Sequence, residues 1–459
     1  MSTPSASLPV AVIGAGPVGL AAAAQLATRG QDFVVVEAGD SIASSVSDWA
    51  HVRLFSPWRL NTDPAARTLL EATGWRAPDP VVLPTGGELI ADYLVPLAAH
   101  PAIAPRLRLG VAVTAIARLG VDRLRTAGRE RAPFLLRLSD GTEVLASAVI
   151  DASGTWRTPN PLGGYGIPAH GEAPARRAGR IFDGMPDVTG ALRAAFAGKA
   201  VAVVGAGHSA SGTLLALVDL ADTVHWLVRA PNAYRAYGGG DADALPARGA
   251  IGTRVRALVD AGRVTVHTGF FVQEITDQGL VSTDGRKADA EVIVNATGAR
   301  PDHTLAGELR LDLDPILGST RALAPLIDPN VHSCGTVPPH GVDELAHPEP
   351  GFYIVGAKSY GRAPTFLLAT GYEQVRSIVA ALAGDRAAAR DVRLELPETG
   401  VCSTSLALDA ADSADASCCG TPVVAEPARG LATGVGGGLL TLSLVEIGAA
   451  DRSSVGCCG

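Results

Sequence analysis

The amino-acid sequence predicts an α/β fold with two Rossmann-like domains, the second inserted into the first, and three observations predict it. The first is an internal repeat, because residues 10–20 and residues 201–211 each contain an apolar run followed by a glycine-rich turn. An alanine- and leucine-rich stretch follows each turn, so each copy has the order strand, turn, helix. The second observation is a further apolar segment after each copy, at residues 33–37 and 223–229. Both segments are predicted to be strands beside the first.

The third observation is a pair of apolar segments, residues 149–155 and 292–298, that end at a turn of small residues and glycine. We expect each segment to close the sheet of one domain. After the second segment the chain would return to the first domain, with a strand at residues 352–355 and a helix at residues 364–383. The first domain is predicted to have two parts, residues 1–157 and 321–400, and the inserted second domain spans residues 158–320. A flexible, cysteine-containing tail follows at residues 401–459.

The first glycine-rich turn has the spacing of a dinucleotide-binding site, with Gly14, Gly16 and Gly19 in the pattern GxGxxG and Pro17 inside it. Glycines at this spacing permit a tight turn, the close approach of a pyrophosphate to backbone N–H groups, and close packing of helix on strand. Glu37 follows at the end of the next predicted strand, where its carboxylate can accept hydrogen bonds from both ribose hydroxyls. The combination predicts a dinucleotide with an unphosphorylated ribose.

The second turn lacks a carboxylate at the matching position. Val228 stands where the first copy has Glu37, and Arg229 follows it. A carboxylate would repel a ribose 2′-phosphate, whereas a guanidinium binds it in bidentate fashion, so this turn is predicted to bind NADPH. Arg235 and Arg248 are candidate helpers, with solvated surface arginines as the alternative. The predicted cofactor contacts of this turn are Gly205, Gly207, His208, Ser209, Ala210 and Arg229.

Composition excludes several other classes of protein. The net charge is −8 and the basic residues are scattered, which gives no electrostatic footprint for nucleic acid. Residues 1–28 carry no charged side chain, but glycines and Pro17 interrupt them, so we expect neither a signal peptide nor a membrane anchor. The expected location is therefore the cytoplasm, with the six cysteines reduced.

These motifs resemble the glutathione-reductase-like flavoproteins with two dinucleotide domains, and among them the flavin-containing monooxygenase-like branch. The resemblance covers about residues 8–400 and includes both turns, Thr297 and Gly298 with residues 300–302 downstream, and residues 84–94. It implies FAD in the first domain and NADPH in the second. It also implies further cofactor contacts at Ser56, Ser153, Gly154, Thr297, Gly298, Gly356, Thr365 and Phe366.

A closer resemblance is to the flavin-dependent monooxygenases encoded in bacterial arsenic-resistance operons, and residues 49–58, 330–336 and 358–367 carry it. It implies a reduced flavin that forms a flavin hydroperoxide with O₂ and oxygenates a soft nucleophile, with a trivalent arsenical as a candidate. The implied catalytic residues are Arg53, Asn61 and Lys358. In the family an asparagine of the equivalent loop steadies the peroxide. Lys358 stands where related flavoproteins often place an aspartate near the ribityl chain, and the alternative is a surface lysine.

The disulfide-reductase branch of the same superfamily is the natural rival. That branch needs two cysteines near the flavin, four residues apart in one common form. Residues 38–49 contain no cysteine, and no pair with that spacing occurs anywhere in the chain. Oxygen is therefore the predicted electron acceptor. Two alternatives stay open: an NADPH-dependent reductase or oxidase that passes electrons to an external acceptor, and a non-catalytic, metalloid-binding flavoprotein.

Two groups of side chains could hold a metal or metalloid. Residues 332–347 contain His332, His340 and His347, for which metal ligation, a wall of the flavin pocket and plain structure are the three alternatives. The tail contains two cysteine pairs, whose thiolates would suit trivalent arsenic, with an unstructured tail as the alternative. The candidate metalloid ligands are Cys418, Cys419, Cys457 and Cys458.

Overall fold

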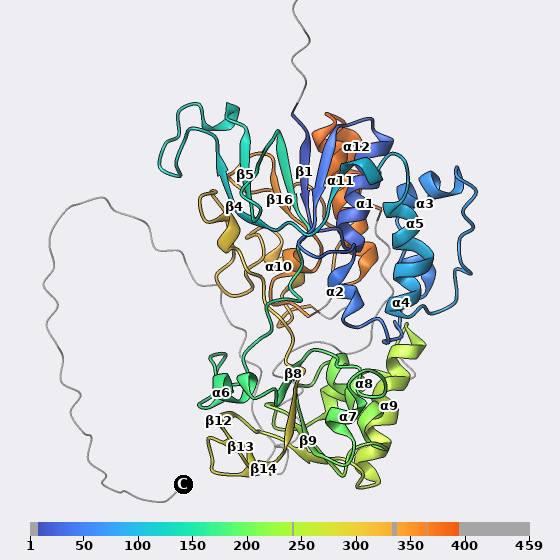
Figure 1. Ribbon diagram of the computed structural model, residues 1–459, viewed down its shortest axis with the longest axis vertical. Coiled ribbons are helices and arrows are strands. Elements are labelled where there is room, and N and C mark those ends of the chain that lie inside the picture. Colours follow the sequence, from blue (N-terminus) through green and yellow to red (C-terminus); the bar gives the residue numbers. More distant parts are fainter. Residues whose placement is uncertain (1–7, 241–242, 333–336, 365, 394–459) are drawn as a thin grey trace, which may run out of the picture. The chain divides into compact units, whose positions relative to one another are not determined.

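The structure is a computed structural model, and it describes residues 8–240, 243–332, 337–364 and 366–393. All of these residues belong to one compact unit of the chain, Met1–Asp412. Within that unit the secondary structure forms two five-stranded sheets and two three-stranded sheets. Figure 1 shows the elements along the chain.

The first five-stranded sheet has the order β16-β7-β1-β2-β3, and all its neighbouring strands are parallel. Its strands β1, β2 and β7 are buried along their whole length, as parallel strands covered on both faces should be. The bounds are Val10–Ile13 for β1, Phe33–Val36 for β2, Leu107–Arg108 for β3, Ala148–Asp151 for β7 and Phe352–Ile354 for β16.

Helices α1 and α11 pack against each other beside this sheet, as Figure 1 also shows. Helix α1 spans Pro17–Thr28, begins with proline at its first turn, and buries a run of four alanines. Helix α11 spans Leu368–Leu382. A three-stranded antiparallel sheet belongs to the same part of the chain, with β4 at Val113–Arg118, β5 at Phe134–Leu138 and β6 at Glu143–Ala146.

The second five-stranded sheet has the order β11-β10-β9-β15-β8 and is also parallel. Its strands are β8 Ile181–Asp183, β9 Ala200–Val204, β10 Thr223–Leu227, β11 Thr265–His267 and β15 Val292–Asn295. Helices α8 and α9 pack against each other beside it, at His208–Leu217 and Pro246–Asp260. A second small sheet is formed by β12 Val272–Thr276, β13 Gly279–Ser282 and β14 Lys287–Asp289.

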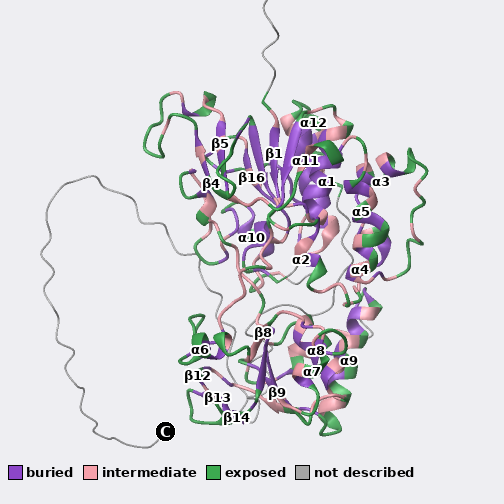
Figure 2. Ribbon diagram, in the orientation of Figure 1, coloured by how far each residue is buried: buried purple, intermediate pink, exposed green. Residues whose placement is uncertain are grey.

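Short helices fill the connections between these elements. Figure 2 shows the buried residues concentrated in the sheets and in the helices that cover them. The short helices are α2 Ser44–Ser47, α3 Pro64–Glu71, α4 Gly86–Glu88, α5 Val95–Ala98, α6 Glu172–Arg177, α7 Arg193–Phe196, α10 Ala324–Ile327 and α12 Arg386–Arg390.

The structure confirms the predicted fold class, an α/β fold with two parallel Rossmann-like sheets. Four element bounds are corrected. The predicted strands at residues 33–37, 223–229 and 352–355 end at Val36, Leu227 and Ile354. The helix expected from residue 364 begins at Leu368, because Leu367 is extended. The domain boundaries near residues 157 and 320 stay predictions, and the tail lies outside the described residues.

No helix within the described ranges is long and apolar enough to cross a membrane.

Candidate functional site

The two glycine-rich turns stand at the same register in their sheets. Ile13 of β1 pairs with Val36 of β2, and Val204 of β9 pairs with Leu227 of β10. The residue that follows each second strand is Glu37 in the first copy and Val228 in the second. The equivalence inferred from sequence spacing is therefore also the equivalence in space.

The carboxylate of Glu37 is buried and turned toward the first turn. One oxygen, Oε2, accepts a hydrogen bond from the Ala15 N–H at 2.7 Å. The other, Oε1, accepts bonds from the Gly39 N–H and the Ser44 hydroxyl, both at 2.9 Å. A carboxylate offers about four lone-pair sites, so roughly one remains for a ribose hydroxyl. The three protein donors hold the acid in place before any cofactor binds.

The three glycines of the first turn differ in what a side chain at each position would contact. Gly14 has a φ of +95°, and a Cβ on it would lie 2.8 Å from the Ala152 carbonyl oxygen. A Cβ on Gly19 would lie 1.9 Å from the Gly14 carbonyl oxygen, so helix and turn are in direct backbone contact. A Cβ on Gly16 would meet nothing within 4 Å, which leaves open space beside the turn. This open side at the N-terminus of α1 fits an anionic pyrophosphate.

A cavity of about 590 Å³ begins at this turn and passes the ends of β7 and β16. The chemistry of its lining fits a flavin dinucleotide, because it combines the glycine-rich turn and a ribose-binding acid with apolar walls. It contains most of the contacts predicted for the first domain: Gly14, Gly16, Pro17, Glu37, Ser153, Gly154, Gly356 and Phe366. Ser56 does not line it, and Thr365 lies outside the described residues.

Lys358 is buried below this cavity, with only 2% of the residue exposed. Its Nζ lies 2.7 Å from Asp151 Oδ2 and 3.0 Å from the Ser153 hydroxyl, and that hydroxyl donates to Asp151 Oδ1 at 2.6 Å. The alternative of a surface lysine is therefore wrong. Through Ser153, which lines the cavity, the buried ion pair fixes one side of the flavin site.

The loop after α2 does not bring the other catalytic candidates to the cavity. Asn61 is only 1% exposed; its Nδ2 donates to the carbonyls of Ser56 and Pro57, and its Oδ1 accepts from the Ser56 hydroxyl. Arg53 is exposed and forms an ion pair with Glu88 at 3.6 Å. The three predicted catalytic residues are thus in three different places, and Asn61 and Ser56 bond to each other within the loop rather than face the flavin cavity.

The second turn repeats the plan of the first with different side chains. Gly205 has a φ of +132°, and a Cβ on it would lie 2.2 Å from the Ala296 carbonyl oxygen. Its own carbonyl accepts a 2.7 Å hydrogen bond from the indole of Trp226. Thr297 Oγ1 donates to Asn295 Oδ1 at 2.6 Å, and Gly298 has a φ of +85°. The turn and its flanking strands are therefore as closely packed as in the first copy.

Asn295 occupies the position of Asp151, because Asp151 pairs with Ile13 and Asn295 pairs with Val204. The hydroxyl two residues later bonds back to it in both copies. Asp151 requires a cation, which Lys358 supplies, whereas the neutral amide of Asn295 needs none.

Arg229 and Arg248 differ in their availability to a 2′-phosphate. Arg229 is exposed, and its Nη1 makes one long hydrogen bond of 3.4 Å to the Gly164 carbonyl. Arg248 is buried and forms a two-pronged ion pair with Asp243, at 2.6 and 2.7 Å. The suggestion that Arg248 assists phosphate binding is therefore corrected, since its guanidinium is already neutralised.

The histidines near residue 340 have structural partners. His332 bonds to the Pro325 carbonyl and His340 to the Gln374 side chain. His347 accepts from the Asp312 N–H, and burial, followed by the charge of His303, lowers its pKa to about 4. Within the described ranges no three histidine, cysteine or acidic side chains are grouped as a metal site. The cysteines proposed as metalloid ligands lie outside those ranges.

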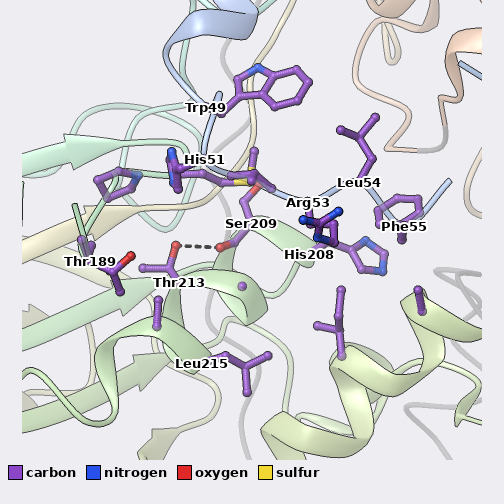
Figure 3. A pocket seen from close by; sticks show the side chains of 18 of the residues that line it. Trp49, His51, Arg53, Leu54, Phe55, Thr189, His208, Ser209, Thr213 and Leu215 are labelled. Atoms are coloured by element: carbon purple, nitrogen blue, oxygen red, sulfur yellow. Dashed lines mark hydrogen bonds between the residues drawn. The ribbon is translucent and has the colours of Figure 1, made fainter. Parts of the chain in front are cut away.

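Sequence reasoning missed a second cavity, of about 620 Å³, shown in Figure 3. Loop residues 49–55 line one side, and residues of α8 such as Ser209 and Thr213 line the other. Trp49 lines both this cavity and the flavin cavity, so the two adjoin at this residue. The segments that line this cavity are far apart in sequence. Only the loop was identified from the sequence, because residues 49–58 resemble the arsenic-operon monooxygenases.

Phe55 connects the loop to the second domain at this cavity. The centroid of the Phe55 ring lies 5.1 Å from that of His208, and the Arg248 guanidinium lies 5.6 Å from the same Phe55 centroid. The pKa of His208 is lowered, first by burial and then by the positive charge of Arg248. At neutral pH His208, at the start of α8, is therefore uncharged, and its ring forms part of the cavity wall.

The two glycine-rich turns and the cavity at the first of them are features of a dinucleotide-dependent protein. The chain belongs to the pyridine nucleotide-disulphide oxidoreductase family, whose model matches residues 9–319. Membership supports the use of a flavin and a nicotinamide cofactor. No curated protein matches the chain.

Solved structures share the fold at low sequence identity. The bacillithiol disulfide reductase Bdr (YpdA) from Bacillus cereus is 20% identical, with a TM-score of 0.61, over 82% of this chain and 99% of that one. A flavin-containing monooxygenase from Stenotrophomonas maltophilia is 20% identical, with a TM-score of 0.53, over 82% and 99%. Thioredoxin reductase from T. acidophilum is 16% identical, with a TM-score of 0.52, over 83% and 99%. Disulfide reductases and a monooxygenase thus share this architecture, which therefore does not choose between them.

Proposed function

We propose that the chain is an FAD-dependent, NADPH-consuming monooxygenase that oxygenates a soft nucleophile. One substrate molecule, one NADPH, one proton and one O₂ would give the substrate with one added oxygen atom, NADP⁺ and one water. The bound flavin would supply the acceptance of a hydride and the reaction with oxygen. The observation that carries the proposal is a flavin-type cavity in a chain whose first cysteine is residue 334.

The position of the cysteines favours an acceptor from outside the chain. Transfer of electrons through a protein disulfide requires two sulfur atoms that can form a bond. Residues 1–333 contain none, and they include the turn, β1, β2 and β7 around the flavin cavity. The cavity lining contains no cysteine either. Oxygen is the outside acceptor we favour, because the resemblance to flavin-dependent monooxygenases implies it.

In this proposal the protein binds and orients the cofactors. Glu37 would accept a ribose hydroxyl, and the N–H groups at the start of α1 would face the pyrophosphate. Lys358 would hold Asp151 and Ser153 at the cavity wall, and the exposed Arg229 would bind the 2′-phosphate of NADPH. Trp49, between the two cavities, would help to exclude water from the reaction site.

A trivalent arsenical is the substrate that the resemblance to arsenic-operon monooxygenases suggests. The tail cysteines would capture it and deliver it to the flavin, since thiolates are preferred ligands of soft ions. Deletion of residues 401–459 should then weaken the binding of arsenite and methylarsenite and leave NADPH oxidation intact. Unchanged arsenical affinity in the deleted chain would end the idea.

The second candidate is an NADPH-dependent reductase that passes electrons to an external acceptor such as a quinone, dye or protein disulfide. Membership of the pyridine nucleotide-disulphide oxidoreductase family favours it. The lack of a cysteine pair near the flavin is compatible with it as long as the acceptor is a separate molecule. A third possibility is a metalloid-binding flavoprotein without catalytic activity.

One experiment separates the three candidates. The full chain loaded with FAD is reduced by NADPH without oxygen, and the loss of flavin absorbance is followed. Isotopically labelled O₂ is then added with methylarsenite or an aryl thioether. Label in the product at about one atom per NADPH supports the monooxygenase. Hydrogen peroxide with every substrate and rapid reduction of a quinone support the reductase, and no bleaching by NADPH supports the non-catalytic protein.

A further inference from the structure

The cavity beside Trp49 has apolar walls, and basic side chains but no acidic ones are among its lining residues. Its lining includes Trp49, Phe55, Leu83 and Ile251, and its charged or titratable members are two arginines and two histidines. No aspartate or glutamate is among the lining residues. At about 620 Å³ it is in the size range of sites for small organic molecules. Such a lining selects an apolar molecule that carries a negative charge.

One of the two arginines is not neutralised within the part of the chain that the structure describes. Arg53 pairs with Glu88 at 3.6 Å. Arg254, on α9, forms neither a hydrogen bond nor an ion pair with any described residue, although Arg256 on the same helix pairs with Asp260 at 3.8 Å. A guanidinium that lines an apolar cavity is a suitable partner for a carboxylate.

The cavity lies beside the flavin cavity and adjoins the second turn, because two of the predicted NADPH contacts, His208 and Ser209, line it. Trp49 is common to both cavities. The other four predicted contacts, Gly205, Gly207, Ala210 and Arg229, do not line the second cavity, and Thr213 further along α8 does. A molecule in it would therefore lie between the flavin cavity and the second turn.

We propose that this cavity binds the substrate, and that the substrate is a compact organic anion whose carboxylate pairs with Arg254. Its apolar body lies along Phe55 and Ile251, and its soft atom, such as a thioether sulfur, faces Trp49 and the flavin cavity. This inference rests on the proposed monooxygenase function for the reaction, but the binding that it predicts does not require turnover.

The test measures binding by calorimetry to the full chain loaded with FAD, without NADPH. The probes are para-(methylthio)benzoate and its neutral counterpart para-(methylthio)benzamide. The anion should bind about tenfold more tightly, the size expected for one charge-assisted hydrogen bond. Arg254→Gln should remove this preference and leave the affinity for the amide unchanged. Arg256→Gln is the matched control, on the same helix and outside the cavity, and should keep the preference.

A second variant tests the cavity itself. Ile251→Trp would fill it and should abolish the binding of both probes, while flavin content and thermal stability show whether the variant is folded. Equal binding of the two probes to the native chain, or an undiminished preference in Arg254→Gln, would overturn the inference. Binding of the probes that survives Ile251→Trp would show that they bind elsewhere on the protein, and this result would also overturn the inference.

Failure of the inference and failure of the proposed function can be told apart. If the anion binds through Arg254 but no labelled oxygen enters it, the binding site stands and the monooxygenase proposal fails for this class. If a neutral thioether is oxygenated but the anion has no preference, the monooxygenase stands and the anion site fails.

Discussion

The two glycine-rich turns have the same backbone plan and different charges. In each, a glycine with positive φ lies against the end of the sheet's neighbouring strand, and a hydroxyl bonds back to the polar residue that closes that strand. The residue after the second strand is Glu37 in the first copy, whereas in the second copy it is Val228, followed by Arg229. The comparison teaches that the backbone defines a dinucleotide site, whereas one or two side chains decide which dinucleotide it selects.

The same comparison holds for the strands that close the sheets. Asp151 in the first copy is ionically paired with Lys358, and Asn295 in the second bonds to neutral groups and to Asp183. Helix packing differs as well: Gly19 has no room for a side chain, whereas Ala210 at the matching position is fully buried. Each difference can be tested by a substitution that gives one copy the residue, or the lack of charge, found in the other.

The largest effect is expected at Lys358. Lys358→Met would leave the Asp151 carboxylate buried without its cation, which should lower the free energy of unfolding by about 3–5 kcal/mol. The double variant Lys358→Met with Asp151→Asn imitates the neutral second copy and should recover most of that loss. Denaturant unfolding monitored by flavin and tryptophan signals gives the values. A double variant as unstable as the single one would contradict the equivalence of the two strands.

The next effect concerns the helix that follows each turn. Gly19→Ala places a Cβ within 1.9 Å of a backbone oxygen, so turn and helix must separate, at about 1–3 kcal/mol and with loss of bound flavin. Ala210→Gly should cost about 1 kcal/mol and keep the flavin. Flavin per chain and the thermal midpoint measure both. Retention of full flavin by Gly19→Ala would show that the first turn does not carry the cofactor.

The coenzyme preference should depend on Arg229. Arg229→Ala should raise the apparent KM for NADPH about 10- to 100-fold, because a charge-assisted contact with the 2′-phosphate is lost, and should leave the KM for NADH nearly unchanged. Steady-state oxidation of both coenzymes checks this, with Arg256→Ala as the control. Equal changes for the two coenzymes would refute the assignment of the second turn.

The smallest effect is a pH dependence that only the second copy should show, since His208 stands where the first copy has Pro17. Burial lowers the pKa of His208 in the folded chain below its usual 6.5, so the unfolded chain takes up the proton first. Stability from this group is therefore fully present above pH 6.5 and is lost as the pH falls below it. His208→Gln should narrow the difference in unfolding midpoint between pH 7.5 and pH 5.5. An unchanged difference would show that His208 does not titrate in this range.

The parts of the fold that the sequence predicts are those determined by local patterns. Apolar runs, glycine spacing and the acid after the second strand identify both sheets, and Glu37 and Val228 stand where the spacing predicts. Local patterns cannot show what distant residues do to one another. The burial of Lys358 depends on Asp151, 207 residues away in the chain, and the cavity beside Trp49 is formed by five separated segments. Asn61 was predicted from a resemblance to act on the flavin, but its amide is used to close its own loop.

We expect the first turn to hold a flavin, and the second turn to bind the phosphorylated coenzyme that reduces this flavin. The most direct test of this expectation is anaerobic reduction of the FAD-loaded full chain in a stopped-flow instrument, with NADPH and NADH compared over a range of concentrations. The account predicts that NADPH bleaches the flavin at concentrations about 10- to 100-fold lower than NADH. Equal concentration dependence for the two coenzymes, or no bleaching by either, would contradict it.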